Sequence, residues 1–368
     1  MQLANRMNHL GTETAFEVLA RANALAAQGR DIINLGIGQP DFQTPENIVE
    51  AGRKALADGH HGYTPANGIP ELRQAVADDI LKYRGATIDP EHVVIQPGGK
   101  PTMFYACLMF GEAGAEIMYP NPGFPIYESA IRFSGATPVP IELHEDTGFS
   151  FSANPTGGVV QKAELDKLVA GLERHPEVVI LSDEIYSRMV YDNQPHISLL
   201  SYPSIRDRLI LLDGWSKTYA MTGWRLGYAI WPEACAEQAT RLCVNDHSCV
   251  NAATQWAGVE ALRGPQDAAD KMVKAFDERR EVIVDELNAI PGFRCVRPGG
   301  AFYAFPNIEG TGMTSSVLQE KMLNEAGVAA ISGTSFGAFG EGYLRFSYAN
   351  STENIIAAMG RIRDLVAA

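Results

Sequence analysis

The sequence predicts an α/β fold: a large domain with a mostly parallel sheet flanked by helices, joined to a smaller α+β domain. Short apolar runs alternate with helical periodicity between residues 92 and 231, which is typical of an open α/β sheet. A second group of strands and helices follows the break at Pro291 and Gly292. We therefore expect a large domain over 40–265, and a small domain made of 1–39 and 266–368.

The N-terminal elements follow from apolar spacing and from glycine and proline. Residues 14–28 have helical periodicity that stops at Gly29, and 46–57 and 71–85 are also predicted helices. Between the first two, "INLGIGQPDFQTP" predicts a short strand that runs into a glycine- and proline-rich turn.

The central elements are six predicted strands with helices between several of them. The predicted strands are His92–Gln96, Glu116–Tyr119, Thr137–Ile141, Val178–Ser182, Leu209–Asp213 and Leu226–Trp231. The predicted helices among them are 100–110, 124–134 and 162–174. A long charged helix over 264–289 follows, and the C-terminal part adds "FRCVRPGGAFYAFP", a helix near 315–326, "YLRFSYA" and a helix over 352–366.

Charge and cysteine content narrow the class of protein. The 30 Lys and Arg and 44 Asp and Glu give a net charge of −14, which argues against nucleic acid and anionic membranes as partners. The five cysteines are scattered and contain no CxxC pair, so neither a disulfide framework nor a metal site is indicated. With no apolar leader and no run of membrane-spanning length, we expect a cytoplasmic protein.

Several chemistry-bearing residues follow predicted strands directly. Asp183 and Lys217 each come after an apolar strand, and "PGGK" at 97–100 joins a strand to a helix. Ligands of open α/β sheets bind beyond the carboxyl ends of the strands, and a helix N-terminus there suits an anion. Each residue alone is more often a cap, an ion pair or a solvated side chain. Together with Arg225 they match pyridoxal 5'-phosphate, which needs an amine, an acid opposite its pyridine nitrogen and a phosphate cradle.

The motifs resemble one family from end to end. "GQPDF", "YTPANGIPELR", "PGGK", "ANPTGG", "SDEIY", "SKTYAMTGWRLGY", "GGAFY" and "LRFSYA" occur in the order found in class I/II aminotransferases of the aspartate aminotransferase superfamily. The sequence is thus similar to fold-type I pyridoxal phosphate-dependent enzymes, which implies their fold and cofactor.

The resemblance implies roles around the cofactor ring. Lys217 corresponds to the lysine that binds the cofactor covalently and then moves the substrate proton. Asp183 corresponds to the partner of the pyridine nitrogen. Tyr186 and Asn154 correspond to donors to the ring oxygen, and Phe124 to the aromatic that stacks on the ring.

The resemblance also implies the phosphate and substrate contacts. The phosphate would be held by Gly99, Lys100 (through its backbone N–H) and Arg225. Tyr63 would reach the phosphate of the neighbouring subunit, which implies a homodimer with shared sites. Arg345 would bind the substrate α-carboxylate as a fork, helped by Asn154 and the Gly38 backbone.

Lys217 and its aromatic neighbours have a physical reason to occur together. A lysine that acts as a nucleophile must be neutral part of the time, and both an apolar pocket and nearby cations lower its pKa. The stretch around Lys217 and Arg225 offers both. Asp183 should stay ionised, because a pyridinium would stabilise its charge.

The segment before Asn154 departs from the family pattern. The asparagine of this motif normally ends a central strand that follows a helix, whereas "ELHEDTGFSFSANPTGG" has room for neither. About one helix-plus-strand unit is absent, and we expect the strands on either side to face each other across a gap. Gly214 also replaces a serine that contacts the phosphate in many members, a place that Ser216 could fill.

The sequence indicates an aminotransferase that exchanges an amino group between an L-amino acid and a 2-oxo acid by a ping-pong mechanism. A β-eliminating lyase of the same fold would begin with the same residues, so the motifs leave that alternative open. The short segment before Asn154 leaves open a catalytically impaired relative. The substrate is not identified; Thr14, Ile37 and Tyr303 are the candidates for its side-chain contacts.

Overall fold

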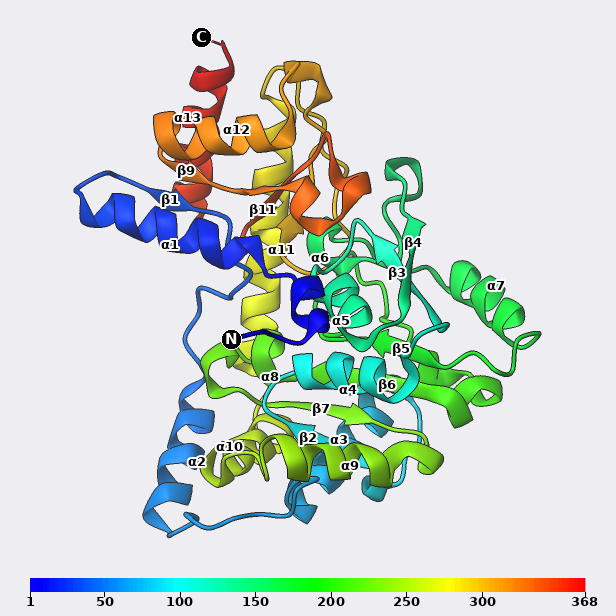
Figure 1. The fold of residues 1–368 in the computed structure, drawn as a ribbon. Coiled ribbons are helices and arrows are strands. Elements are labelled where there is room, and N and C mark those ends of the chain that lie inside the picture. Colours follow the sequence, from blue (N-terminus) through cyan, green and yellow to red (C-terminus); the bar gives the residue numbers. More distant parts are fainter. Residues whose placement is uncertain (368) are drawn as a thin grey trace.

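The structure, a computed structural model, describes residues 1–367. Its elements form a lower and an upper group, and the long helix α11 (Asp267–Asn288) runs from one to the other (Figure 1). The upper group is built from both ends of the chain, since β1 (Ile33–Asn34) pairs in parallel with β9 (Val328–Ala329).

The central sheet has four strands in the order β2-β7-β6-β5. Their bounds are Val93–Gln96 (β2), Gly227–Ile230 (β7), Leu209–Gly214 (β6) and Ile180–Asp183 (β5). Strand β7 runs antiparallel to both neighbours while β5 and β6 are parallel, so the sheet is mixed and only β7 opposes the common direction.

A second, two-stranded sheet lies apart from the central one. It contains β3 (Glu116–Asn121) and β4 (Thr137–Glu142), paired in parallel over their full length. Within the described residues, no strand connects β3 to β5. The gap expected from the short segment before Asn154 is therefore present.

Helices cover both faces of the central sheet. They are α2 (Glu46–Ala57), α3 (Pro70–Arg84), α4 (Lys100–Phe110), α5 (Ile126–Ser134), α7 (Lys162–Leu172), α8 (Trp215–Thr218), α9 (Glu233–Asp246) and α10 (Ala252–Arg263), with the single turn α6 (Ala153–Thr156) before α7. The alternation of side chains along the strands decides which helix meets which face. Val93 and Leu211 belong to a core cluster with residues of α3, α7 and α10, whereas Val94 and Ile210 pack with residues of α4 and α9.

The upper group is a small α+β unit. Its three-stranded sheet has the order β10-β11-β8, with β10 (Ile331–Ser332), β11 (Leu344–Ser347) and β8 (Tyr303–Ala304) all antiparallel to their neighbours. The helices α1 (Thr14–Ala27), α12 (Ser315–Lys321) and α13 (Thr352–Ala367) lie around it (Figure 1). Its apolar core includes Phe276 of α11, so this helix is shared with the lower group.

Most predicted elements occur within a few residues of their expected bounds. The two helices α9 and α10 were not predicted, because the mixed small and polar residues of 233–263 give no clear apolar stripe. The predicted helix over 264–289 begins three residues later, at Asp267.

Candidate functional site

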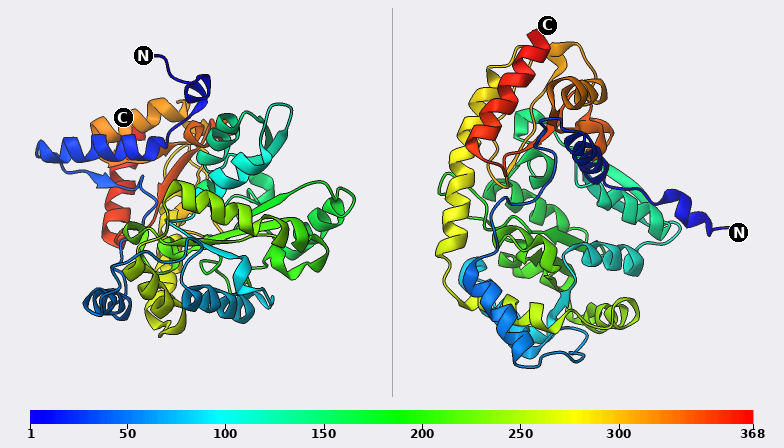
Figure 2. Two further views of the ribbon diagram at one scale, coloured as in Figure 1. Left: turned by 60° about the horizontal axis from the view of Figure 1, so that its bottom comes forward. Right: turned by 90° about the vertical axis from the view of Figure 1, so that its left-hand side faces the viewer.

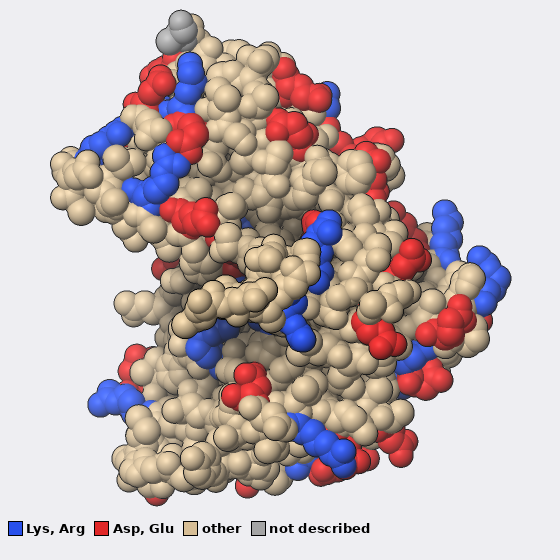
Figure 3. Space-filling view, viewed as in Figure 1, with Lys and Arg blue, Asp and Glu red and all other residues tan. Residues whose placement is uncertain are grey.

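A large cavity lies at the carboxyl ends of β5 and β6 and at the N-terminus of α4. Its volume is about 1220 Å³. The predicted site residues that line it are Gly38, Gly99, Lys100, Phe124, Asn154, Asp183, Tyr186, Lys217, Arg225 and Arg345, together with the substrate-contact candidates Ile37 and Tyr303. Figure 3 shows this face of the molecule hollowed, with basic side chains gathered around the hollow. Two predicted residues do not line the cavity: Tyr63, which is 92% exposed, and the substrate-contact candidate Thr14.

Lys217 lies in the short helix α8, directly after β6. Its Nζ donates a hydrogen bond to the Gly38 carbonyl oxygen over 2.5 Å. Burial, together with the smaller effects of the nearby cations Arg345, Lys100 and Arg225, lowers the pKa of Lys217 to about 8, against an opposing effect of Glu13. The predicted lowering of this pKa is confirmed, so the amine is partly neutral near neutral pH.

Asp183 ends β5 and faces into the cavity. Its Oδ2 accepts a hydrogen bond from the Tyr127 hydroxyl at 2.8 Å, and its Oδ1 accepts one from the Ile185 N–H at 3.2 Å. Burial raises the pKa of Asp183 to about 6, while both donors oppose that shift. The carboxyl is thus mainly ionised at neutral pH in the protein alone.

Tyr127 was missed by sequence reasoning. It lies at the start of α5, three residues after Phe124, and the turn before the helix, closed by the hydrogen bond from the Tyr127 N–H to the Phe124 carbonyl oxygen at 3.0 Å, brings the two residues together. The two rings meet edge to face with their centroids 5.7 Å apart. That spacing was the available signal, but nothing in the sequence shows that the hydroxyl reaches Asp183.

An anion cradle is formed by the turn before α4 and by Arg225. Gly98 has a φ of +92°, and Gly99 caps the N-terminus of α4, whose first backbone N–H groups have no partner within the helix. The guanidinium of Arg225 donates to the carbonyl oxygens of Pro97 and Thr222 at 3.2 and 2.8 Å. A Cβ at Gly98 would lie 2.2 Å from Arg225 Nη2, so a larger residue would both strain this positive φ and displace the guanidinium from the cradle.

The Lys100 side chain turns away from this cradle. Its Nζ pairs with Glu13 over 2.5 Å and lies 5.6 Å from the ring centroids of both Phe16 and Phe124. Only its backbone therefore remains as a phosphate contact. Sequence reasoning missed Glu13 because its partner is 87 residues away.

Arg345 extends from β11 and is 3% exposed. One Nη donates to Asn154 Oδ1 at 2.8 Å, the other donates to the Gly36 carbonyl, and the guanidinium lies 4.6 Å from the Tyr303 ring centroid. Its Nε is buried and has no hydrogen-bond partner in the described chain. An unpartnered buried donor beside an aromatic face suits a carboxylate ligand.

Two tyrosines close the site on the side of Gly38. The hydroxyls of Tyr186 and Tyr303 are 2.7 Å apart, so one donates to the other. A Cβ at Gly38 would lie 2.2 Å from the Tyr303 hydroxyl oxygen, which explains why glycine occupies this position. Asn154 also lines the cavity, so the short segment before it does not remove it from the site.

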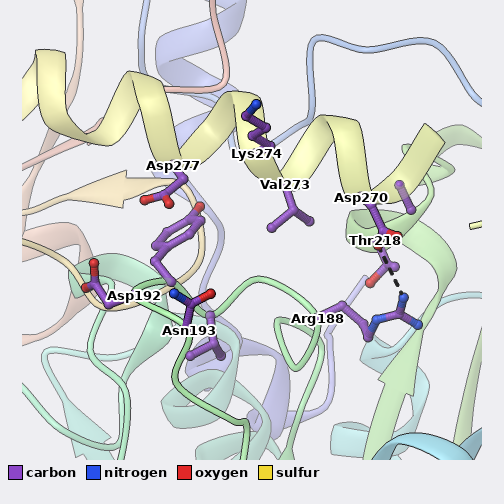
Figure 4. A pocket seen from close by; sticks show the side chains of 11 residues that line it. Arg188, Asp192, Asn193, Thr218, Asp270, Val273, Lys274 and Asp277 are labelled. Carbon is purple, nitrogen blue, oxygen red and sulfur yellow. Dashed lines mark ion pairs between the residues drawn. The ribbon is translucent and has the colours of Figure 1, made fainter. Parts of the chain in front are cut away.

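A second pocket of about 260 Å³ lies between α11 and the loop after β5. Asp270, Val273 and Asp277 point toward it from the helix, and Arg188 and Asn193 lie on the side of the loop (Figure 4). Arg188 pairs with Asp270 at 3.8 Å. The charged side chains of this second pocket are thus partly paired with one another, and no predicted site residue lines the pocket.

The large cavity has the set of groups that pyridoxal phosphate requires. It combines a partly neutral amine, a carboxylate opposite, an anion cradle whose glycine cannot carry a Cβ, and a guanidinium with an unpartnered donor. An α/β fold with this site defines an enzyme that acts on amino groups through that cofactor.

Comparison with known proteins agrees with this class. The sequence model of the family described as "Aminotransferase class I and II" matches residues 30–153 and 152–362. The aspartate aminotransferase of Pyrococcus horikoshii is 39% identical over 359 residues, covering 92% of this chain and 91% of that protein. The probable aspartate/prephenate aminotransferase of Aquifex aeolicus is 36% identical over 388 residues, covering 98% of each.

Solved structures show the same fold. The aspartate aminotransferase from Rhizobium meliloti superposes with a TM-score of 0.94 at 30% identity, over 100% of this chain and 99% of that one. The chain belongs to the class I and II aminotransferase family, and it is a pyridoxal 5'-phosphate-dependent aminotransferase. No helix in the described part is long and apolar enough to cross a membrane.

The comparison also locates the departure from the family. The two matched pieces meet at residues 152 and 153, where the sequence lacks a helix-plus-strand unit. The alignment with the Aquifex relative spans 388 positions, which is longer than the 368 residues of this chain. Some positions of that relative therefore have no counterpart here.

Proposed function

We propose that Lys217 is the acting amine of this aminotransferase, which exchanges an amino group between an L-amino acid and a 2-oxo acid in two ping-pong half-reactions. The observation that carries the proposal is the meeting of three groups in one cavity. These are the Lys217 amine with a pKa of about 8, the Asp183 carboxyl and the buried Arg345 guanidinium.

Pyridoxal phosphate supplies an aldehyde carbon that accepts the amino group and a ring that takes up electrons when the substrate Cα–H bond breaks. With the cofactor bound, Lys217 would carry a proton between the substrate Cα and the former aldehyde carbon of the cofactor, because an amine with this pKa exists in both protonation states near pH 7–8. Asp183 would hold the ring nitrogen of the cofactor and keep it protonated by opposite charge. Tyr186 and Asn154 donate to the ring oxygen, and Phe124 covers one ring face.

The remaining contacts orient the two anionic ends of the ligands. Gly99, the Lys100 backbone N–H and Arg225 bind the phosphate at the N-terminus of α4. Arg345 binds the α-carboxylate of the substrate through Nε and one Nη, while Asn154 Oδ1 fixes the plane of the guanidinium. The Gly38 carbonyl holds the Lys217 amine.

The substrate side chain lies toward Ile37 and the Glu13–Lys100 pair, with Thr14 and Tyr303 nearby. This wall carries both charges and an apolar surface, which accords with relatives named for aspartate and for aspartate/prephenate. A panel of amino donors, each scored by its half-reaction with the cofactor-loaded enzyme, would identify the preferred class.

We also propose a cytoplasmic homodimer with shared sites. The exposed Tyr63 then contacts the partner's phosphate, and the N-terminal segment that stands away from the body in Figure 2 packs on the partner. The cysteines are all unpaired, which suits a reducing compartment. Each subunit would move as two domains, 40–265 and 1–39 with 266–368.

The dimer proposal has a direct test. Tyr63→Ala and Lys217→Ala variants are each expected to be inactive alone. When mixed, unfolded and refolded together, they should regain up to about a quarter of the activity, because a shared-site heterodimer contains one intact site. Sedimentation as a monomer, or mixtures without regained activity, would contradict shared sites.

Reduction with borohydride tests the role of Lys217. The reagent should leave the cofactor covalently attached to the peptide that contains Lys217, as read by mass spectrometry, and Lys217→Ala should remove that signal. Attachment to another lysine refutes the assignment. Turnover must also depend on an added 2-oxo acid; pyruvate and ammonia released without it would indicate the β-lyase instead.

A further inference from the structure

The strongest unexplained feature is the gap between the two sheets, at the end of the large cavity away from Lys217. Strand β3 pairs with β4, and β5 pairs with β6, and throughout residues 1–367 neither has a partner on its other edge. Residues 116–120 and 177–183 nevertheless line the same cavity. Two strand edges with unpaired backbone groups thus border one space.

The burial of β5 shows that this edge is open. Every residue of β2, β6 and β7 is buried, whereas all four residues of β5 are only partly buried. On the other side of the gap, Met118 is 60% exposed, and next to β5 Val179 is 37% exposed. Parallel strands are normally buried on both faces, so a partly exposed strand that carries a site residue is unusual.

The gap is a groove with apolar walls above and below. Helix α4 contributes Met103, Ala106, Cys107 and Phe110, and helix α7 contributes Leu165 and Leu168. These two helices pack on opposite faces of the central sheet. An occupant at the level of the sheet would therefore be covered on both faces, as in the middle of a parallel sheet.

The cavity is larger than its ligands need. Pockets for small molecules and cofactors measure about 300–1000 Å³. The cavity here measures about 1220 Å³ and continues from the cofactor site along both strands.

The segment between β4 and Asn154 supplies no strand for the groove, and of its residues only Phe151, Ser152 and Ala153 line the cavity. After β4 the chain reaches Asn154 through residues 143–153, in which Phe149 and Phe151 take φ values of 52° and 74°. Positive φ at such bulky residues is uncommon and marks a tight passage. The exposed N-terminal stretch "MQLANRMNHL" mixes apolar with polar residues, which does not suit a space that is apolar on both faces.

The entrance of the groove is acidic. Glu116 begins β3 and Glu177 lies three residues before β5, and both line the cavity. The carboxyl ends of the two strands lie toward the site, where Tyr127 meets Asp183, so the strands run in the same direction. The amino end of a parallel occupant would therefore lie between the two glutamates.

We propose that this groove binds a separate peptide of extended conformation, which adds as a parallel strand between β3 and β5. Its chemistry is an apolar run of about six residues, the usual length of a strand, preceded by a basic residue. Backbone hydrogen bonds to both edges provide affinity, apolar side chains fill both faces, and the basic residue meets Glu116 and Glu177. The proposal is independent of the roles assigned to Lys217 and Arg345.

The test uses the cofactor-loaded enzyme and a dye-labelled probe peptide, one lysine followed by about six valine and isoleucine residues. Fluorescence anisotropy should show saturable binding with a Kd in the range of about 1–100 μM. Hydrogen exchange should show new protection of the amides in 116–121 and 177–183. A probe with proline at its centre, which lacks one backbone donor, should bind at least about tenfold more weakly.

Two variants locate the binding. Val179→Asp should weaken binding at least about tenfold, since its charge would be buried under the peptide, while Val244→Asp, on an exposed valine of α9 outside the cavity, should have no effect. Glu116→Lys should weaken binding of the probe with a free lysine several-fold, but should not weaken binding of a probe in which that lysine is acetylated.

Absence of saturable binding refutes the proposal, as does protection confined to other segments or equal weakening by Val179→Asp and Val244→Asp. If the same amides become protected with rising protein concentration and no peptide, a second copy occupies the groove and the proposal of a separate peptide is wrong.

Discussion

Tyr127→Phe is expected to raise the pKa of Asp183, because it removes a donor to the charged carboxylate and leaves the burial unchanged. The hydroxyl lies 2.8 Å from Oδ2, and burial has already raised that pKa to about 6. A hydrogen bond to a charged group contributes about 1.5–3 kcal/mol, and each pKa unit corresponds to about 1.4 kcal/mol. The pKa should therefore rise by about one to two units, to about 7–8.

This change is large enough to alter the charge at neutral pH. With a pKa of about 6, roughly nine-tenths of Asp183 is ionised at pH 7. With the pKa of about 7–8 expected in Tyr127→Phe, only roughly a half to a tenth of Asp183 would be ionised at that pH. The pKa can be measured from the intensity of the infrared C=O band of the protonated carboxyl as a function of pH in the cofactor-free protein. The band is assigned to Asp183 if it is lost in Asp183→Asn. In the loaded enzyme, the acid limb of the half-reaction rate should move to higher pH.

The matched control is Tyr105→Phe. That hydroxyl donates to Asp246 over the same 2.8 Å, outside the cavity. It should leave the Asp183 band and the acid limb in place. A midpoint for Tyr127→Phe within about half a unit of the parent protein would refute the reasoning that this hydrogen bond offsets the burial of Asp183.

Three further outcomes are expected. Lys217→Met should stabilise the cofactor-free protein by about 1–3 kcal/mol at pH 7 and by little at pH 10. The folded-state pKa of Lys217 near 8 lies below the unfolded value of 10.5, so the cost of burying the charged amine is complete below pH 8 and is lost as the pH rises from 8 to 10.5. Urea unfolding at both pH values measures the effect, and an equal stabilisation at pH 7 and pH 10 would contradict this reasoning. Arg345→Lys should lower kcat/KM for the amino donor by about tenfold to a hundredfold, mainly by raising KM, since an ammonium cannot form the bidentate contact to a carboxylate. Steady-state kinetics with one donor measure both constants, and an unchanged KM would show that Arg345 does not bind the substrate. Gly98→Ala should weaken cofactor binding at least about tenfold in equilibrium dialysis, because the new Cβ would lie 2.2 Å from Arg225 Nη2 at a φ of +92°. The control is Gly59→Ala, at a similar φ of +88° with open space around it, which should change stability but not cofactor affinity.

The sequence by itself determined the class of fold and the identity of the main site residues. Apolar runs alternating with helices predict an α/β sheet, and the carboxyl ends of such strands meet at one edge. Asp183, Lys217 and the turn at Gly98 and Gly99 could therefore be grouped by their positions along the chain, and motif order added Arg345. The sequence also showed the missing unit before Asn154, because a strand and a helix need more residues than that segment contains.

The tertiary structure alone decided how these groups are tuned. The hydrogen bond from Tyr127 to Asp183 joins residues 56 apart in sequence, the Glu13–Lys100 pair joins residues 87 apart, and the contact of Arg345 with Asn154 joins residues 191 apart. No local periodicity encodes such contacts, because they depend on how separate elements pack. The same reason applies to the groove: the sequence indicates that a strand is absent, but only the packing of α4 and α7 over β3 and β5 shows that the space stays open.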